Sequence, residues 1–304
     1  MESVLQTCDL GKRFGKRWAA RGIDLEVRRG DIFCFLGPNG AGKSTTIRMI
    51  LTLLKPTTGT VQLFGKDPHK NRVEALSRVC GIVEKPDFYL YLSASKNLEL
   101  LGSLTRRITG DEIMEVLARV GLTQRAHDKV RTFSHGMKQR LGIAQALLTR
   151  PELIILDEPT TGLDPQGMKD VRELIQRLAH EEGMTIFLSS HLLSEIEQVA
   201  TRMAVVHRGQ VVAQGAVSDL LAQEATDYSL QVSPVKQALK IIKTLPWVTV
   251  LASGDKGIEV RLEPDRAAEL NKALCTKGIE VFALYPRRTL EDFFLKVTKG
   301  APEI

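Results

Sequence analysis

The stretch from Gly37 to Thr45 restricts the possible folds of this chain more than any other. It reads Gly37-Pro38-Asn39-Gly40-Ala41-Gly42-Lys43-Ser44-Thr45, which has the form G-x-x-x-x-G-K-[ST] of a phosphate-binding loop. Glycines allow successive backbone N–H groups to converge on an anion, because no Cβ obstructs the turn. The competing interpretation is a plain glycine-rich turn without a ligand.

The residues on either side of this loop favour phosphate binding. Residues 32–36 are apolar and predict a buried strand before the loop, and residues 45–54 predict a helix after it. The N-terminus of that helix would present partial positive charge to the phosphates. Lys43 would reach the β- and γ-phosphates, and the Ser44 hydroxyl would ligate Mg²⁺. The sequence therefore predicts a nucleotide site.

Composition limits the classes to which the chain can belong. Its 304 residues suit one large and one small domain, and 43% hydrophobic with 26% charged residues suits a globular protein with a core. We find no signal peptide and no run of roughly eighteen apolar residues that would span a bilayer. The net charge of +6 is spread without blocks of like charge, which favours a solvated basic surface, with contact to membrane lipid as the alternative. The sequence contains no C-x-x-C pair. We expect all four cysteines to be buried and reduced: Cys8, Cys34, Cys80 and Cys275.

The order of apolar segments predicts two domains. Strands alternate with helices over residues 1–222, which predicts an α/β fold around a largely parallel sheet. It begins with strands over 4–9 and 23–27, joined by a basic turn over 12–17. The segment at about 85–130 has helical periodicity and predicts a helical insertion. Residues 223–304 follow the order β-α-β-β-α-β, which predicts a small α+β ferredoxin-like accessory domain.

Polar side chains follow the predicted strands, where an open α/β sheet places its ligand. Asp157 and Glu158 end the apolar run 153–156; Asp157 would hold Mg²⁺, and Glu158 would polarise an attacking water. Two exposed carboxylates at a strand end are the alternative. His191 follows another strand, and a single histidine is often structural. Phe14 would stack on a purine ring or pack beneath a hairpin.

Together these motifs resemble the ATP-binding cassette (ABC) family, the motor subunits of ATP-driven transporters, over about residues 1–220. Residues 37–45 match the family's first nucleotide motif, and 153–160 match the second, with Glu158 at the catalytic carboxylate. Residues 162–164 match the loop that couples two sites, and residues 133–140 the signature sequence. His191 matches the switch histidine, and Phe14 the adenine-stacking aromatic. The resemblance implies the cassette fold, ATP hydrolysis and a requirement for Mg²⁺.

Three positions depart from the family pattern, two in the signature and one at Glu84. In the signature, His135 replaces the usual glycine and Met137 the usual glutamine, whereas Ser134 and Gly136, which meet the γ-phosphate of a partner's nucleotide, are kept. Glu84 stands where most members have a metal-ligating glutamine, so the resemblance implies that Glu84 is a third Mg²⁺ ligand. The sequence around Glu84 and the signature is most similar to cassettes of bacitracin- and lantibiotic-type exporters. That branch also handles other drugs, polysaccharide and lipid.

The resemblance also implies the partners. The chain has one phosphate loop and one signature, so we expect it to pair with a second cassette, as a homodimer or with a relative. Separate transmembrane permease subunits would form the pore, which places the chain at the cytoplasmic face of the membrane without a nucleic-acid partner. The alternatives are a soluble cassette ATPase acting on ribosomes or DNA, and a P-loop kinase. The first usually has two cassettes or a long coiled coil, and the second has no use for the signature helix.

Overall fold

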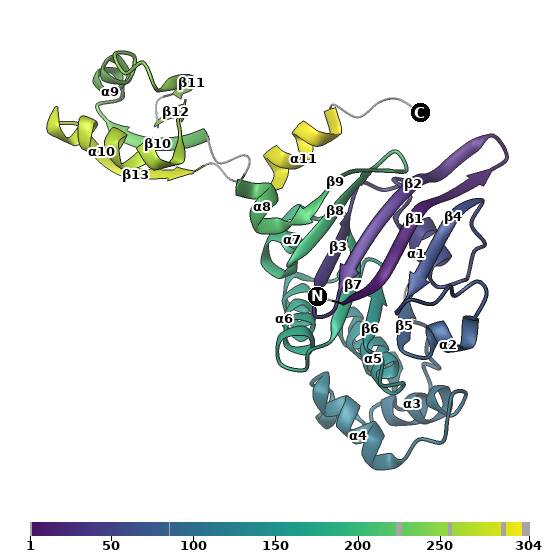
Figure 1. Cartoon of the computed structure of the whole chain (residues 1–304). Helices are drawn as coiled ribbons and strands as arrows, with labels where there is room; N and C mark the ends of the chain where they lie inside the picture. Colours follow the sequence, from purple (N-terminus) through teal and green to yellow (C-terminus); the bar gives the residue numbers. More distant parts are fainter. Residues whose placement is uncertain (1, 85, 223–226, 255–256, 287–289, 300–304) are drawn as a thin grey trace. The chain divides into compact units, whose positions relative to one another are not determined.

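The computed structural model describes residues 2–299 except 85, 223–226, 255–256 and 287–289 (Figure 1). The chain divides into two compact units, Met1–Gly215 and Ala216–Lys299. The domain boundary predicted from the sequence, after residue 222, falls next to a segment that lies outside the described residues. Each unit is described by itself.

A six-stranded sheet forms the centre of the first unit, in the order β5-β6-β7-β3-β8-β9. Its strands are β3 (Ile32–Leu36), β5 (Val79–Ile82), β6 (Leu153–Leu156), β7 (Thr185–Ser190), β8 (Arg202–His207) and β9 (Gln210–Ala216). The neighbours from β5 to β8 are parallel, and every residue of β3, β6 and β7 is buried. Such strands read as continuous apolar runs because both faces are covered. The predicted parallel sheet is confirmed.

A second, antiparallel sheet has the order β2-β1-β4, with β1 at Ser3–Phe14, β2 at Arg17–Arg28 and β4 at Thr58–Leu63. The predicted basic turn over residues 12–17 is wrong. Both strands continue to the end of the hairpin, where Phe14 pairs with Arg17. Three register shifts between residues 7 and 13 of β1 interrupt the alternation of side chains, so the strand pattern is lost from the sequence there.

Seven helices belong to the first unit among the described residues: α1 (Lys43–Ile50), α2 (Arg72–Leu76), α3 (Ala94–Gly102), α4 (Gly110–Arg119), α5 (His135–Leu147), α6 (Pro165–His180) and α7 (Leu193–Val199). The predicted insertion contains α3 and α4, which lie beyond α5 at one end of the unit (Figure 1); its expected first residue, Lys85, lies outside the described residues. Helix α2 ends at Leu76, three residues before β5 begins. Val79 already pairs with Leu153 in the sheet, so the helix cannot extend that far.

The second unit contains an antiparallel sheet of order β11-β12-β10-β13. Its elements are α8 (Val217–Ala222), β10 (Asp227–Ser233), α9 (Val235–Ile242), β11 (Thr249–Gly254), β12 (Gly257–Arg261), α10 (Ala267–Thr276), β13 (Glu280–Pro286) and α11 (Leu290–Lys299). From β10 to β13 they follow the predicted order β-α-β-β-α-β. One apolar cluster fills the space between this sheet and helices α9 and α10.

No helix within the described residues is long and apolar enough to span a membrane. Cys34 is buried and Cys80 is half-buried, but Cys8 and Cys275 are exposed. The prediction of buried cysteines is therefore wrong for these two, because Cys8 lies on a solvent-facing position of β1 and Cys275 on the outer face of α10.

Candidate nucleotide site

The phosphate loop connects β3 to α1, and two of its glycines are required by close contacts. Gly42 is the N-cap of α1 and has a φ of 103°. A Cβ at Gly42 would lie 2.4 Å from the carbonyl oxygen of Ala19, and a Cβ at Gly37 would lie 2.3 Å from that of Val206. Neither contact is possible for a side chain, so the loop passes where only glycine fits.

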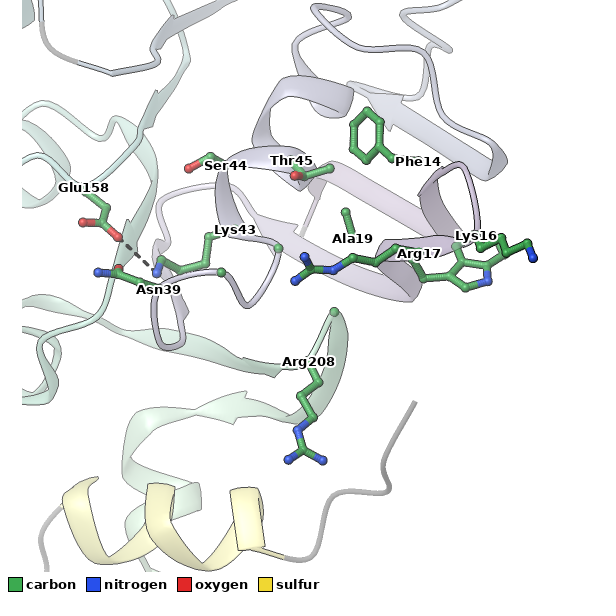
Figure 2. Close-up of a pocket in the computed structure, with 14 residues that line it drawn as sticks. Phe14, Lys16, Arg17, Ala19, Asn39, Lys43, Ser44, Thr45, Glu158 and Arg208 are labelled. Atoms are coloured by element: carbon green, nitrogen blue, oxygen red, sulfur yellow. Dashed lines mark ion pairs between the residues drawn. The ribbon is translucent and has the colours of Figure 1, made fainter.

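A cavity of about 840 Å³ opens beside this loop (Figure 2). Its size suits a nucleotide. Eight of the residues predicted for the site line it: Phe14, Asn39, Gly40, Gly42, Lys43, Ser44, Thr45 and Glu158. The cavity therefore brings the phosphate loop together with the end of β6 and the tip of the β1–β2 hairpin.

Lys43 is held by oxygen atoms of the site. Its side chain is almost fully buried, and Nζ donates hydrogen bonds to the carbonyls of Gly37 at 2.7 Å and Pro38 at 3.2 Å. The same Nζ lies 3.0 Å from Oε1 of Glu158, and Figure 2 shows the two side chains pointing toward one another. A buried ammonium needs such partners, and an incoming phosphate would replace the carboxylate.

Glu158 stands between three donors. Its Oε2 accepts a hydrogen bond from Oγ1 of Thr161 at 2.8 Å and lies 3.0 Å from Nδ1 of His191, opposite the contact with Lys43. Burial favours the neutral acid, but the hydrogen bonds from Thr161 and Lys43 outweigh it and hold the pKa of Glu158 below its usual value. The carboxylate is therefore ionised at neutral pH, in contact with the predicted switch histidine.

Asp157 is joined to Glu158 through Ser189. The Ser189 hydroxyl donates to Oδ1 of Asp157 at 2.6 Å and accepts the backbone N–H of Glu158 at 2.9 Å. Within the described part of the chain, no group of three acidic, histidine or cysteine side chains could hold a metal alone. The Ser44 hydroxyl and the Asp157 carboxylate are hard oxygen donors, so they fit a Mg²⁺ that takes its other ligands from nucleotide phosphates and water.

Phe14 does not pack beneath the hairpin, so that alternative is wrong. The ring is 54% exposed and lines the cavity at the tip of β1. Nζ of Lys12 lies 5.4 Å from its centroid, and the carbonyl of Lys55 accepts a hydrogen bond from this Nζ at 2.7 Å. A cation near an aromatic ring is attracted to its π-system. Stacking of a purine on Phe14 stays a prediction.

Eight predicted site residues do not line this cavity: Gly37, Pro38, Ala41, Glu84, Ser134, Gly136, Asp157 and His191. Three of them lie away from the contacts described so far. The Glu84 carboxylate forms an ion pair with Arg48 of α1. Ser134 is the N-cap of α5, where its hydroxyl accepts the N–H of Met137 at 3.2 Å. Gly136 is buried, and a Cβ there would lie 3.2 Å from the Cα of Gly167 in α6. Their roles toward Mg²⁺ and toward a second subunit stay predictions.

Six residues that the sequence reasoning did not assign also line the cavity: Lys16, Arg17, Trp18, Ala19, Arg208 and Gly209. The first four lie at the β1–β2 turn, where two cations near Phe14 gave a weak signal. Gly209 lies in the β8–β9 turn; its N–H donates to the carbonyl of Ala41 at 3.0 Å, and its own carbonyl accepts from Arg21 at 2.8 Å. These contacts join segments far apart in sequence, so no local pattern could indicate them.

Comparison with known proteins identifies the family. The model of the ABC transporter family matches residues 20–161. The bacitracin transport ATP-binding protein BcrA of Bacillus licheniformis is 40% identical over 302 residues, which cover 99% of this chain and 99% of that protein. This chain belongs to the family of ABC transporter ATP-binding proteins. The lantibiotic transport ATP-binding protein SrtF of Streptococcus pyogenes is 37% identical, over 69% of this chain and 89% of that protein.

A solved structure of an ATP-binding subunit of an ABC transporter has the same fold, with a TM-score of 0.63 and 29% identity over 72% of this chain and 92% of that chain. The predicted family and the α/β cassette fold are therefore confirmed. The cassette binds nucleotide and hydrolyses ATP. A bacterial ABC transporter cassette with the same fold, with a TM-score of 0.62 and 24% identity over 70% of this chain and 98% of that chain, was solved as a dimer.

Proposed function

We propose that this cassette drives the export of a peptide antibiotic, a drug or a lipid-like molecule. The support comes from relatives that this chain matches over most of their length. These relatives are named for bacitracin transport, lantibiotic transport and daunorubicin resistance. The alternative, a soluble ATPase acting on ribosomes or DNA, finds no support among these relatives. Copurification with a membrane permease or with ribosomes separates the two.

The observation that carries the proposed mechanism is the position of Glu158, between Lys43 and His191 at the phosphate loop. A γ-phosphate would attract Lys43 away from the carboxylate. Loss of this cation and the approach of a negative phosphate both raise the proton affinity of Glu158. Glu158 would then accept a proton from the attacking water as general base, with His191 holding its second oxygen.

Ser44 and Asp157 would hold Mg²⁺ at the phosphates, with Glu84 as a third oxygen donor after a turn away from Arg48. When bound, Mg²⁺ neutralises charge that develops on the phosphate oxygens. The exposed ring of Phe14 would stack on the adenine. Backbone N–H groups of the phosphate loop and the N-terminus of α1 would bind the phosphates themselves.

A second copy would complete the site. Ser134 lies at the N-terminus of α5, whose partial positive charge suits a phosphate, and yet it does not line the cavity of its own chain. Ser134 and Gly136 would therefore face the nucleotide of the partner in a homodimer. The dimer would act at the cytoplasmic face of the membrane with separate permease subunits and without nucleic acid.

Glu158→Gln tests the mechanism. The amide keeps the shape of the side chain and one acceptor oxygen but removes its basicity, so hydrolysis should fall by roughly 10²–10⁴ while ATP binding survives. ATPase assays and nucleotide titrations measure the two quantities. The control is Glu181→Gln, at the exposed end of α6, which should hydrolyse ATP at the wild-type rate. Unchanged turnover in Glu158→Gln would contradict the assignment.

The cargo is tested in cells that produce the cassette together with the membrane permease with which it copurifies. Growth is measured against bacitracin, a lantibiotic and daunorubicin, with wild type and Glu158→Gln compared at equal expression. Protection against one of these compounds that requires the active ATPase supports the export proposal. Equal sensitivity of both strains to every compound contradicts this choice of cargo.

A further inference from the structure

Glu195 is a buried carboxylate to which the mechanism above gives no role. It lies on α7, four residues after His191, and only 6% of the residue is exposed. Its Oε1 is buried without a hydrogen-bond partner among the described residues. Burial of a carboxylate is costly unless its contacts compensate. The role of Glu195 must therefore lie in the contacts of its other oxygen, Oε2.

That other oxygen contacts two separate loops. Oε2 accepts a hydrogen bond from Oγ1 of Thr160 at 2.6 Å and a longer one from Oγ of Ser190 at 3.4 Å. Thr160 follows Glu158 by two residues, and Ser190 directly precedes His191. A single carboxylate oxygen therefore connects the segment that carries the proposed general base to the segment that carries the switch histidine.

The histidine segment is fixed on its other side as well. The Ser190 hydroxyl accepts the N–H of Leu192 at 3.0 Å, which holds the turn around His191. The carbonyl of Ser190 accepts the N–H of Gly37 at 3.1 Å, which joins the same turn to the start of the phosphate loop. Thr160, Ser190 and Glu195 are all buried, so water competes little for these contacts.

We propose that Glu195 is a positioning residue for ATP hydrolysis. By holding Thr160 against the turn at Ser190, it keeps Nδ1 of His191 within reach of Oε2 of Glu158, a separation of 3.0 Å. A displacement of about 1 Å at a reacting pair can cost a hundredfold in rate. This inference rests on the proposed role of Glu158 and adds the residue that sets its geometry.

Two pairs of variants test it in the full-length chain. Glu195→Ala removes the acceptor and Thr160→Val removes the donor, and each should lower kcat about tenfold. Neither residue lines the nucleotide cavity, so Kd for ATP should stay within about twofold. Glu195→Gln and Thr160→Ser keep an oxygen and a hydroxyl at the same places, so both should recover kcat to within about threefold of wild type.

Asp31→Ala is the matched control for loss of a buried carboxylate. Asp31 is 8% exposed, accepts hydrogen bonds from the N–H of Arg28 and from Arg202, and precedes β3 at the end opposite the phosphate loop. It should lower the melting temperature but leave kcat unchanged below the unfolding transition. If Glu195→Ala does not fold, the Thr160 pair decides the question alone.

Two outcomes overturn the inference. One is a wild-type kcat in Thr160→Val together with Glu195→Ala, where both fold. The other is a loss of kcat that Asp31→Ala shares, or that Thr160→Ser fails to recover. Failure of the proposed function is distinct, because it appears as unchanged hydrolysis in Glu158→Gln. If Glu158→Gln is inactive and the Thr160 pair is fully active, only the role of Glu195 is rejected.

Discussion

An exposed ion pair joins the segment after β5 to helix α1. Glu84 has a φ of 70°, a left-handed conformation that costs a residue with a side chain about 1 kcal/mol or more. Its carboxylate pairs with Arg48, in the helix that begins at the phosphate loop, and the Glu84 side chain is 69% exposed. Exposed ion pairs are weak, so the carboxylate can exchange Arg48 for another cation at little cost.

Substitution of Glu84 is predicted to separate a metal ligand from a surface charge. Glu84→Gln keeps an oxygen donor and should retain hydrolysis within about tenfold, which is about 1.4 kcal/mol of barrier. Glu84→Ala should lose more ATPase activity, and transport in particular. Arg48→Ala is the control, since it removes the ion pair and leaves the oxygen. Undiminished hydrolysis and transport in both Glu84 variants would show that Glu84 is only a surface charge.

Predictability differs between individual side chains of the site. Glu158 and His191 could be placed together because each follows a strand of one parallel sheet, and such strands end at the same edge. Glu195 could not, because in the sequence it resembles any polar residue of a short surface helix. The packing of α7 against α6, β3 and β7 buries it beside Thr160, and that packing has no local signature.

At the scale of elements, charged residues before the strands hold the sheet at the end away from the nucleotide. Glu152 precedes β6 and accepts hydrogen bonds from Nη1 of Arg29 at 2.7 Å and from Nη2 of Arg78 at 2.6 Å. Arg29 follows β2 and Arg78 precedes β5. One carboxylate thus joins three chain segments, and hydrogen bonds from Arg78 and then Arg29 lower the pKa of Glu152 to about 2.

This contact predicts a pH dependence of stability. Because the folded-state pKa of Glu152 lies below the ordinary value of 4.5, its contribution is present above pH 4.5 and is lost as the pH falls toward 2. Glu152→Gln should lower the free energy of unfolding at pH 7 by less than about 1 kcal/mol, since the pair is partly exposed. Urea unfolding at several pH values should show this gap closing below pH 4.5. A gap that stays constant down to pH 3 would contradict the prediction.

Elements with a regular pattern were predicted to the residue, and irregular ones were not. Residues 32–36 and 153–156 coincide with β3 and β6, because an uninterrupted apolar run is a local signal. The β1–β2 hairpin was predicted too short because its bulges and its cations hide the alternation of a strand. Helix α1 was predicted to begin at Thr45 but begins at Lys43, inside the phosphate loop itself.

On the scale of the whole molecule, one chain carries half of each predicted ATP site. Ser134→Arg is predicted to leave ATP binding nearly intact and to block turnover, because its bulk would meet the nucleotide of the partner. Lys43→Ala should lose ATP binding, because it removes the cation at the β- and γ-phosphates. A mixture of the two variants contains one undamaged composite site and should recover part of the activity. Each variant mixed with itself is the control, and a mixture as inactive as both controls would leave a role for Ser134 in trans without support.

The two strands around the helical insertion are direct neighbours. Val79–Ile82 pairs with Leu153–Leu156 residue by residue at the edge of the six-stranded sheet, although residues 83–152 lie between them in the chain. The pairing of β5 with β6 therefore fixes where this segment leaves and rejoins the sheet, but it does not fix the length of the segment. Segments of other lengths could therefore replace residues 86–130 on the same sheet, provided that Glu84 and residues 133–140, which the proposed ATP site uses, keep their places.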